Sequence, residues 1–135
     1  MIAAACIAAA PASAGPKKSF NLTTGTAATK GKARGVGTVD FIGPQRVKIA
    51  GRVNDICPGD GYGAYIEFKL NFKGGGYATR VISDQRKCEA SAKTFSFTTP
   101  KFGKRVKSVG VTVIELDQQP GGAVPGDAAR KLIKR

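Results

Sequence analysis

The chain contains no histidine and no tryptophan among its 135 residues. Without histidine it has no Ser-His-Asp or Cys-His catalytic arrangement and no imidazole ligand for a metal. Acidic residues are scarce: nine Asp and Glu stand against 22 Lys and Arg, which gives a formal charge of +13. No long hydrophobic run is present, because the uncharged residues 1–15 fall short of the ~20 that span a bilayer. A chain of this length makes about one domain, which excludes a large two-domain enzyme.

The first residues are rich in alanine and predict an export signal. Small side chains at Ala12 and Ala14 favour signal-peptidase cleavage after Ala14. No Lys or Arg precedes the apolar run, so residues 1–14 are interpreted as a complete or truncated signal, with an Ala-rich disordered start as the alternative. We therefore expect a secreted, extracellular protein.

Both ends of the remaining chain are basic. Residues 15–34 carry five Lys or Arg, no acid and no sustained period, which predicts a flexible basic arm. Residues 118–135 begin with Pro- and Gly-rich turns and end in a basic octamer. We interpret them as a linker and a solvated basic tail, docked in part by Leu132 and Ile133; a last edge strand or a short basic helix is the alternative. Eight of the thirteen net charges then lie outside residues 35–117.

Residues 35–117 alternate between apolar and polar side chains, which is the period of half-buried strands. The clearest case is the run 64–72, where Ile66, Phe68 and Leu70 alternate with polar residues. Gly- and Pro-containing turns separate these runs. The pattern predicts an all-β domain over 35–117, a compact antiparallel β-sandwich of about six to seven strands, with a small β-barrel as the alternative.

Two cysteines, Cys57 and Cys88, remain once the signal is removed. An even number in an exported chain favours a disulfide over two free thiols. Closing a loop of about thirty residues stabilises a small domain by roughly 3–4 kcal/mol on the chain-entropy account.

Residues 53–65 form the most distinctive stretch of the chain. Its ligand-loop candidates are Asp55, Asp60, Tyr62 and Tyr65, and a calcium ion would use Asp55 and Asp60 together with Asp84. The acids do not have the alternate spacing of an EF-hand loop, and the alternative is a plain Asp60-Gly61 turn. We expect no catalytic residues, no bound metal and no cofactor.

The best basic patch surrounds one turn and contains Lys101, Lys104, Arg105 and Lys107. Such a patch suits anionic cell-envelope polymers, although a charge cluster is also typical of a plain solvated face. Specific nucleic-acid binding is not expected, because the chain has no Trp for a stacking platform and most of its net charge lies at its ends.

Four stretches resemble the small secreted proteins of actinobacteria, many of which are described only as hypothetical. The resemblance covers about residues 35 to 117 and is carried by residues 37–41, 51–55, 57–65 and 109–113. It implies export and a β-sandwich, but no activity. Those relatives often carry another cysteine in the last strand, where this chain has Ile114, so no second bridge is expected.

Together these observations predict a non-catalytic binding or interaction module that works outside the cell or at its envelope, with loose affinity for anionic polymers. The alternative is a small secreted enzyme or enzyme inhibitor that acts through the Asp55–Asp60 loop.

The disulfide is testable by alkylation. Without reductant, peptide mapping is expected to find Cys57 and Cys88 unmodified, and reduction is expected to lower the free energy of unfolding by roughly 3–4 kcal/mol. Alkylation of both residues before reduction would show that the bridge does not exist.

Overall fold

The computed structural model describes residues 15–24, 32–56, 63–84, 92–119 and 122–135, with the side chains of 116–127 left aside. The regular secondary structure of these residues consists of β-strands. Eight strands follow one another along the chain: β1 (Lys17–Thr23), β2 (Lys32–Gly43), β3 (Arg46–Ile56), β4 (Ala64–Phe72), β5 (Tyr77–Asp84), β6 (Lys93–Thr98), β7 (Val106–Gln119) and β8 (Gly122–Lys134).

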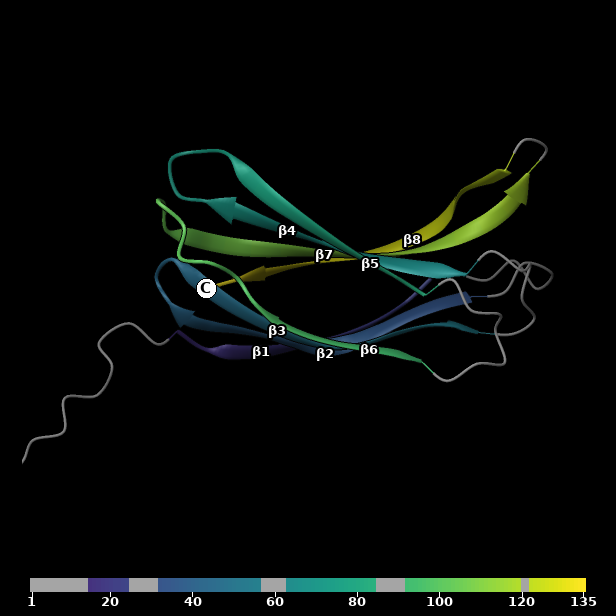
Figure 1. Cartoon of the computed structure of the whole chain (residues 1–135), viewed down its shortest axis with the longest axis horizontal. Helices are drawn as coiled ribbons and strands as arrows, with labels where there is room; N and C mark the ends of the chain where they lie inside the picture. The colour runs from purple at the N-terminus through teal and green to yellow at the C-terminus, as the bar shows by residue number, and fades with distance from the viewer. Residues whose placement is uncertain (1–14, 25–31, 57–62, 85–91, 120–121) are drawn as a thin grey trace, which may run out of the picture.

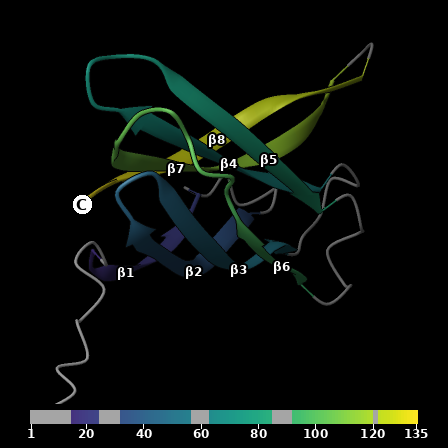
Figure 2. The same ribbon diagram turned by 60° about the vertical axis from the view of Figure 1, so that its left-hand side comes forward.

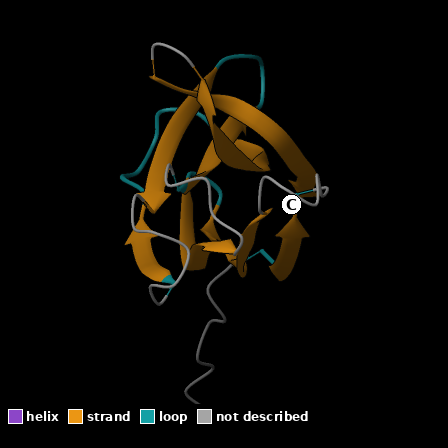
Figure 3. Cartoon of the chain, turned by 90° about the vertical axis from the view of Figure 1, so that its right-hand side faces the viewer, coloured by secondary structure: helices purple, strands orange, loops and turns teal. Residues whose placement is uncertain are grey.

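The strands form two antiparallel four-stranded sheets that pack face to face (Figure 1). Sheet A has the order β1-β2-β3-β6 and sheet B the order β5-β4-β7-β8. Each sheet therefore ends in two edge strands, and Figure 3 shows the same two layers from one end. The predicted all-β sandwich is confirmed for the described residues, whereas the predicted count of six to seven strands is too low.

One additional strand comes from the segment expected to be a flexible arm. Residues 17–23 form β1, which pairs with β2 from Lys17–Asp40 to Thr23–Arg34. Phe20 and Leu22 point inward, and Phe20 is 1% exposed. Two apolar residues at alternate positions are thus enough to dock a strand onto an existing sheet, even among lysines.

The other additional strand comes from the expected linker and tail. Residues 122–134 form β8, the edge of sheet B beside β7. Ile133 faces inward and is 2% exposed, whereas Leu132 faces outward and is 54% exposed. The backbone of the basic octamer is therefore paired with a neighbouring strand, so the segment is the last edge strand given as the alternative and not a solvated tail.

The core lies between the two sheets, on the faces that alternation predicts. Val47, Ile49 and Val53 of β3 are fully buried, as are Ile66 and Phe68 of β4. Phe68 sits at the centre and makes edge-to-face contacts with three other phenylalanines. The ring centroids lie 5.9 Å away for Phe20, 5.5 Å for Phe95 and 5.8 Å for Phe97. Such pairs add about 0.5–1.5 kcal/mol each to the burial of the rings.

Two glycines face each other in the middle of sheet A. Gly37 and Gly51 are directly paired in the β2–β3 ladder. A Cβ atom on Gly51 would lie 2.2 Å from the Val36 carbonyl oxygen, and one on Gly37 would lie 2.8 Å from the Phe20 ring. The bare backbone at this point is therefore the surface on which Phe20 packs.

The gap between the outer strands β1 and β8 is closed by a reciprocal pair of lysines. Lys18 on β1 donates from Nζ to the Lys134 carbonyl of β8 at 2.7 Å. Lys131 on β8 donates from Nζ to the Ser19 carbonyl of β1 at 3.2 Å. Both lysines occupy inward register positions, opposite the buried Val39 and Val111.

The glycine pair gives a stability prediction. Gly51→Ala is expected to lower the free energy of unfolding by about 1–3 kcal/mol, because the added methyl group meets backbone that has to move. Gly103→Ala is the matched control, since nothing lies within 4 Å of its Cβ position, and it is expected to change stability by less than about 0.5 kcal/mol. Urea unfolding measures both variants, and equal effects would contradict the proposed close approach.

Candidate functional site

One end of the sandwich gathers three connections that are distant in sequence (Figures 1 and 2). They are the β2–β3 turn at residues 44–45, the β4–β5 turn at 73–76 and the β6–β7 connection at 99–105. Backbone hydrogen bonds join them: Val106 donates to the Pro44 carbonyl at 2.9 Å, and Lys73 donates to the Arg105 carbonyl at 2.8 Å. The three connections therefore form one continuous surface.

This surface is strongly basic. We define the basic end as residues 43–46, 73–76, 101–107 and 134–135, which contain eight Lys and Arg and no Asp or Glu. All of these basic side chains are exposed except that of Arg135, which is half-buried. They are Arg46, Lys73, Lys101, Lys104, Arg105, Lys107, Lys134 and Arg135.

The basic patch predicted from the sequence is part of this end. Lys101, Lys104, Arg105 and Lys107 all lie in the β6–β7 connection or at the start of β7. Lys104 is fastened to the β4–β5 turn, because its Nζ donates to the Gly75 carbonyl at 3.1 Å. The sequence places these four residues together because they are close along the chain.

Arg135 holds the basic end together rather than projecting from it. Its Nε donates to the Val106 carbonyl at 3.0 Å, and its Nη2 donates to the Gly43 carbonyl. The guanidinium also lies 5.0 Å from the centroid of the Phe41 ring. Burial lowers the pKa of Arg135, and the nearby positive charge of Arg105 lowers it further. Like charges are thus crowded at this end, and its four segments contain no Asp or Glu side chain.

A shallow hollow of about 450 Å³ opens at the β2–β3 turn. It is lined by residues 43–46 and by Lys101. Phe102, next to Lys101, is held by two contacts. Its N–H donates to the Gln45 carbonyl at 3.1 Å, and its ring packs edge-to-face on the Phe72 ring with 4.9 Å between the ring centroids. The hollow is open, so it suits a loosely held anionic group better than an enclosed small molecule.

The opposite end of the sandwich buries three carboxylates. Asp55, Asp84 and Glu115 are 3%, 2% and 2% exposed, and each of them has an interaction partner. Asp84 and Glu115 are the register partners of buried Ala64, on either side of it, so both point into the sandwich from sheet B. Among the described residues, no group of three or more His, Cys, Asp or Glu is arranged to hold a metal ion.

The predicted ligand loop is described only in part. Asp55 points into the sandwich from sheet A, opposite buried Ala33, whereas Tyr65 pairs with Ser83 and Ile114 on the outer face of sheet B. Burial raises the pKa of Tyr65, and the neighbouring Glu67 carboxylate raises it further. The structure does not bring Asp55 and Tyr65 together. The other candidates, Asp60, Tyr62, Cys57 and Cys88, lie outside the described residues.

Sequence reasoning missed half of the basic end. Arg46, Lys73, Lys134 and Arg135 are far from residues 101–107 along the chain. A partial signal was available, because Arg46 and Lys73 flank turn residues at the ends of predicted strands. Their convergence depends on which strands lie side by side, and alternation does not specify this.

Among the residues that the structure describes, no helix has the length and apolar character needed to cross a membrane. Comparison of the chain with protein-family models, curated proteins and solved structures finds no match.

The structural role of Arg135 is testable. Arg135→Met is expected to lower the free energy of unfolding by about 1–2 kcal/mol, because two backbone carbonyls lose a charged donor. Arg130→Met, at an exposed position on β8, the strand that precedes Arg135, is the control and is expected to stay within about 0.5 kcal/mol of the parent chain. Thermal unfolding of the two variants measures both changes in stability. An Arg135→Met variant as stable as the parent chain would contradict the structural role of Arg135.

Proposed function

We propose that the protein is an exported, non-catalytic binding module that works outside the cell or at its envelope and binds anionic polymers loosely through the basic end. The observation that carries the proposal is the convergence of eight Lys and Arg, with no acid, on one end of a rigid sandwich. Export is supported by the signal-like pattern of residues 1–14.

The distribution of the charges favours a polymer over a small ligand. The exposed cations come from four separate segments and surround an open hollow instead of converging on a closed pocket. A chain that carries repeated negative charges contacts several such cations at once, and each contact releases a counterion. Affinity of this kind depends on the number of charges and on salt, and only weakly on the sequence of the polymer.

A second basic surface provides a control. The outer face of sheet A carries Lys17, Lys48 and Arg52, all exposed. Lys17 and Lys48 are register partners of Asp40 on either side, so this face contains an acid among its cations. Removing three charges here changes the net charge of the protein as much as removing three from the basic end.

The test compares two triple variants on one probe. Lys101→Gln, Arg105→Gln and Lys107→Gln are combined in the first, and Lys17→Gln, Lys48→Gln and Arg52→Gln in the second; Lys104 stays, because it bonds to Gly75. Binding to long-chain inorganic polyphosphate is measured by fluorescence anisotropy from about 50 to about 200 mM NaCl. The first variant is expected to reduce the slope of log affinity against log salt by about 2, and the second by less than about 1.

Two outcomes would contradict the proposal. Binding of the parent chain that does not change with salt would exclude a polyanion as the ligand. Equal losses in the two variants would show that net charge acts without a preferred surface. Isolated cell walls replace polyphosphate in a second series, which asks whether an envelope polymer gives the same difference between the variants.

A further inference from the structure

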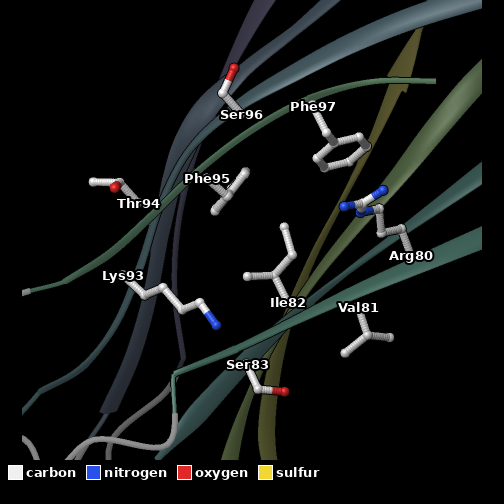
Figure 4. Close-up of a pocket in the computed structure, with 9 residues that line it drawn as sticks. All are labelled: Arg80, Val81, Ile82, Ser83, Lys93, Thr94, Phe95, Ser96 and Phe97. Atoms are coloured by element: carbon white, nitrogen blue, oxygen red, sulfur yellow. The ribbon is translucent and has the colours of Figure 1, made fainter.

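The edge strands of the two sheets face each other across two gaps, one between β1 and β8 and the other between β5 and β6. We call these gaps the two seams of the sandwich. The β5–β6 seam contains a groove (Figure 4). It has a volume of about 550 Å³ and is lined by residues 80–83 of β5 and 93–97 of β6. Ile82, Phe95 and Phe97 form its apolar floor, because they pack against the buried core. The basic end does not contribute to this groove, so the site is distinct from the one proposed above.

The groove carries positive charge at inward positions. Arg80 is the register partner of buried Phe68, and Lys93 is the partner of buried Val53, so both side chains point toward the space between the sheets. No Asp or Glu is among the lining residues. Figure 4 shows the Arg80 side chain beside the Phe97 ring, and the guanidinium carbon lies 4.3 Å from the ring centroid. Stacking of this kind leaves the guanidinium N–H groups available to an acceptor.

The two seams of the sandwich use their inward cations differently. At the β1–β8 seam, Lys18 and Lys131 each donate to a carbonyl of the opposite sheet. At the β5–β6 seam, Arg80 stacks on the Phe97 ring of the opposite sheet, and within the described part of the chain neither Arg80 nor Lys93 donates to a carbonyl across the gap. The β1–β8 seam is thus closed by hydrogen bonds from its own lysines, whereas no such hydrogen bond is found among the described residues of the β5–β6 seam.

Among the edge strands that the structure describes, β5 is the longest one with neither a proline nor a register shift. It runs for eight residues without proline, and its ladder with β4 has no register shift. By contrast, β8 contains Pro125 and its ladder is interrupted between Ile114 and Leu116. Proline and bulges are the usual devices that prevent an edge from pairing with another strand. On the outer face of β5, Tyr77 is 63% exposed and Val81 is 52% exposed.

We propose that the β5 edge binds an extended segment of a partner protein by strand addition, and that the segment alternates acidic and apolar residues. Its backbone would pair with β5, as peptides do when they extend a sheet. Its inward acidic side chains would meet Arg80 and Lys93, and its outward apolar side chains would cover Tyr77 and Val81. A second copy of this chain is a poor occupant, because its own β5 would bring another Arg80 into the same groove.

The test uses a synthetic peptide of alternating Val and Glu, capped at both ends and eight residues long, the length of β5. The parent protein is titrated with it and followed by NMR. Amide shifts and slower hydrogen exchange are expected along residues 77–84. A second peptide is N-methylated at alternate residues, which removes the backbone donors along one edge, and it is expected to bind about tenfold or more weakly.

Variants then separate the groove from the rest of the surface. Arg80→Gln with Lys93→Gln is expected to weaken peptide binding about tenfold, whereas the control Lys48→Gln with Arg52→Gln on the outer face of sheet A is expected to change it little. The basic-end triple variant keeps its affinity for the peptide if the two sites are independent. The N-methylated peptide makes the test independent of whether the Arg80 and Lys93 variant folds.

Several results would overturn the inference. Equal binding of the methylated and unmethylated peptides would exclude strand addition. Loss of peptide binding in the basic-end variant would show that the peptide is held as a simple polyanion at that end, which leaves the proposed function intact. Shifts along β5 that appear without peptide as the protein is concentrated would identify a second copy as the occupant.

Discussion

The edge-to-face packing around Phe68 is the interaction on which the rest of the structure depends. Phe68 lies on β4, a central strand of sheet B, and its ring touches Phe20 from one edge of sheet A and two phenylalanines from the other edge. A single side chain thus spans the width of the facing sheet. These contacts hold both edge strands of sheet A, β1 and β6, against a central strand of sheet B.

Alternation of apolar residues was sufficient to predict the strands whose inner faces form this core. The run 64–72 is a strand with the same bounds as β4, and Ile66, Phe68 and Leu70 are buried as the alternation predicts. It was not sufficient for β1 and β8, because Phe20 and Leu22 are the only apolar residues of β1, and the sequence of β8 mixes its apolar residues with Gly, Pro, Lys and Arg. An edge strand needs less apolar surface than a central strand. Its alternation of apolar and polar residues is therefore too weak to identify it from the sequence.

Only the part of the basic end whose residues are close along the chain could be predicted from the sequence. Residues 101–107 are close along the chain, so their charge was visible in the sequence. The contribution of Arg46, Lys73 and Arg135 depends on backbone contacts between turns, such as the bond from Lys73 to the Arg105 carbonyl. Likewise, the inward direction of Lys18, Arg80, Lys93 and Lys131 follows from register, which a single sequence does not specify. Most of the net charge of +13 therefore lies on residues of strands and turns, and less of it lies on flexible terminal segments than the composition indicated.

The pairing of β8 with β7 also has a consequence for the order of folding during synthesis. β7 is a central strand of the finished sheet, and its buried valines complete the core beside β4. Until the last thirteen-residue strand has been made, one side of β7 has no backbone partner, and the lysine that reaches Ser19 from the far end of the chain does not yet exist. An unpaired, apolar central strand is prone to aggregation. Formation of the native sheet therefore requires that β8 has been synthesised and is free to pair with β7.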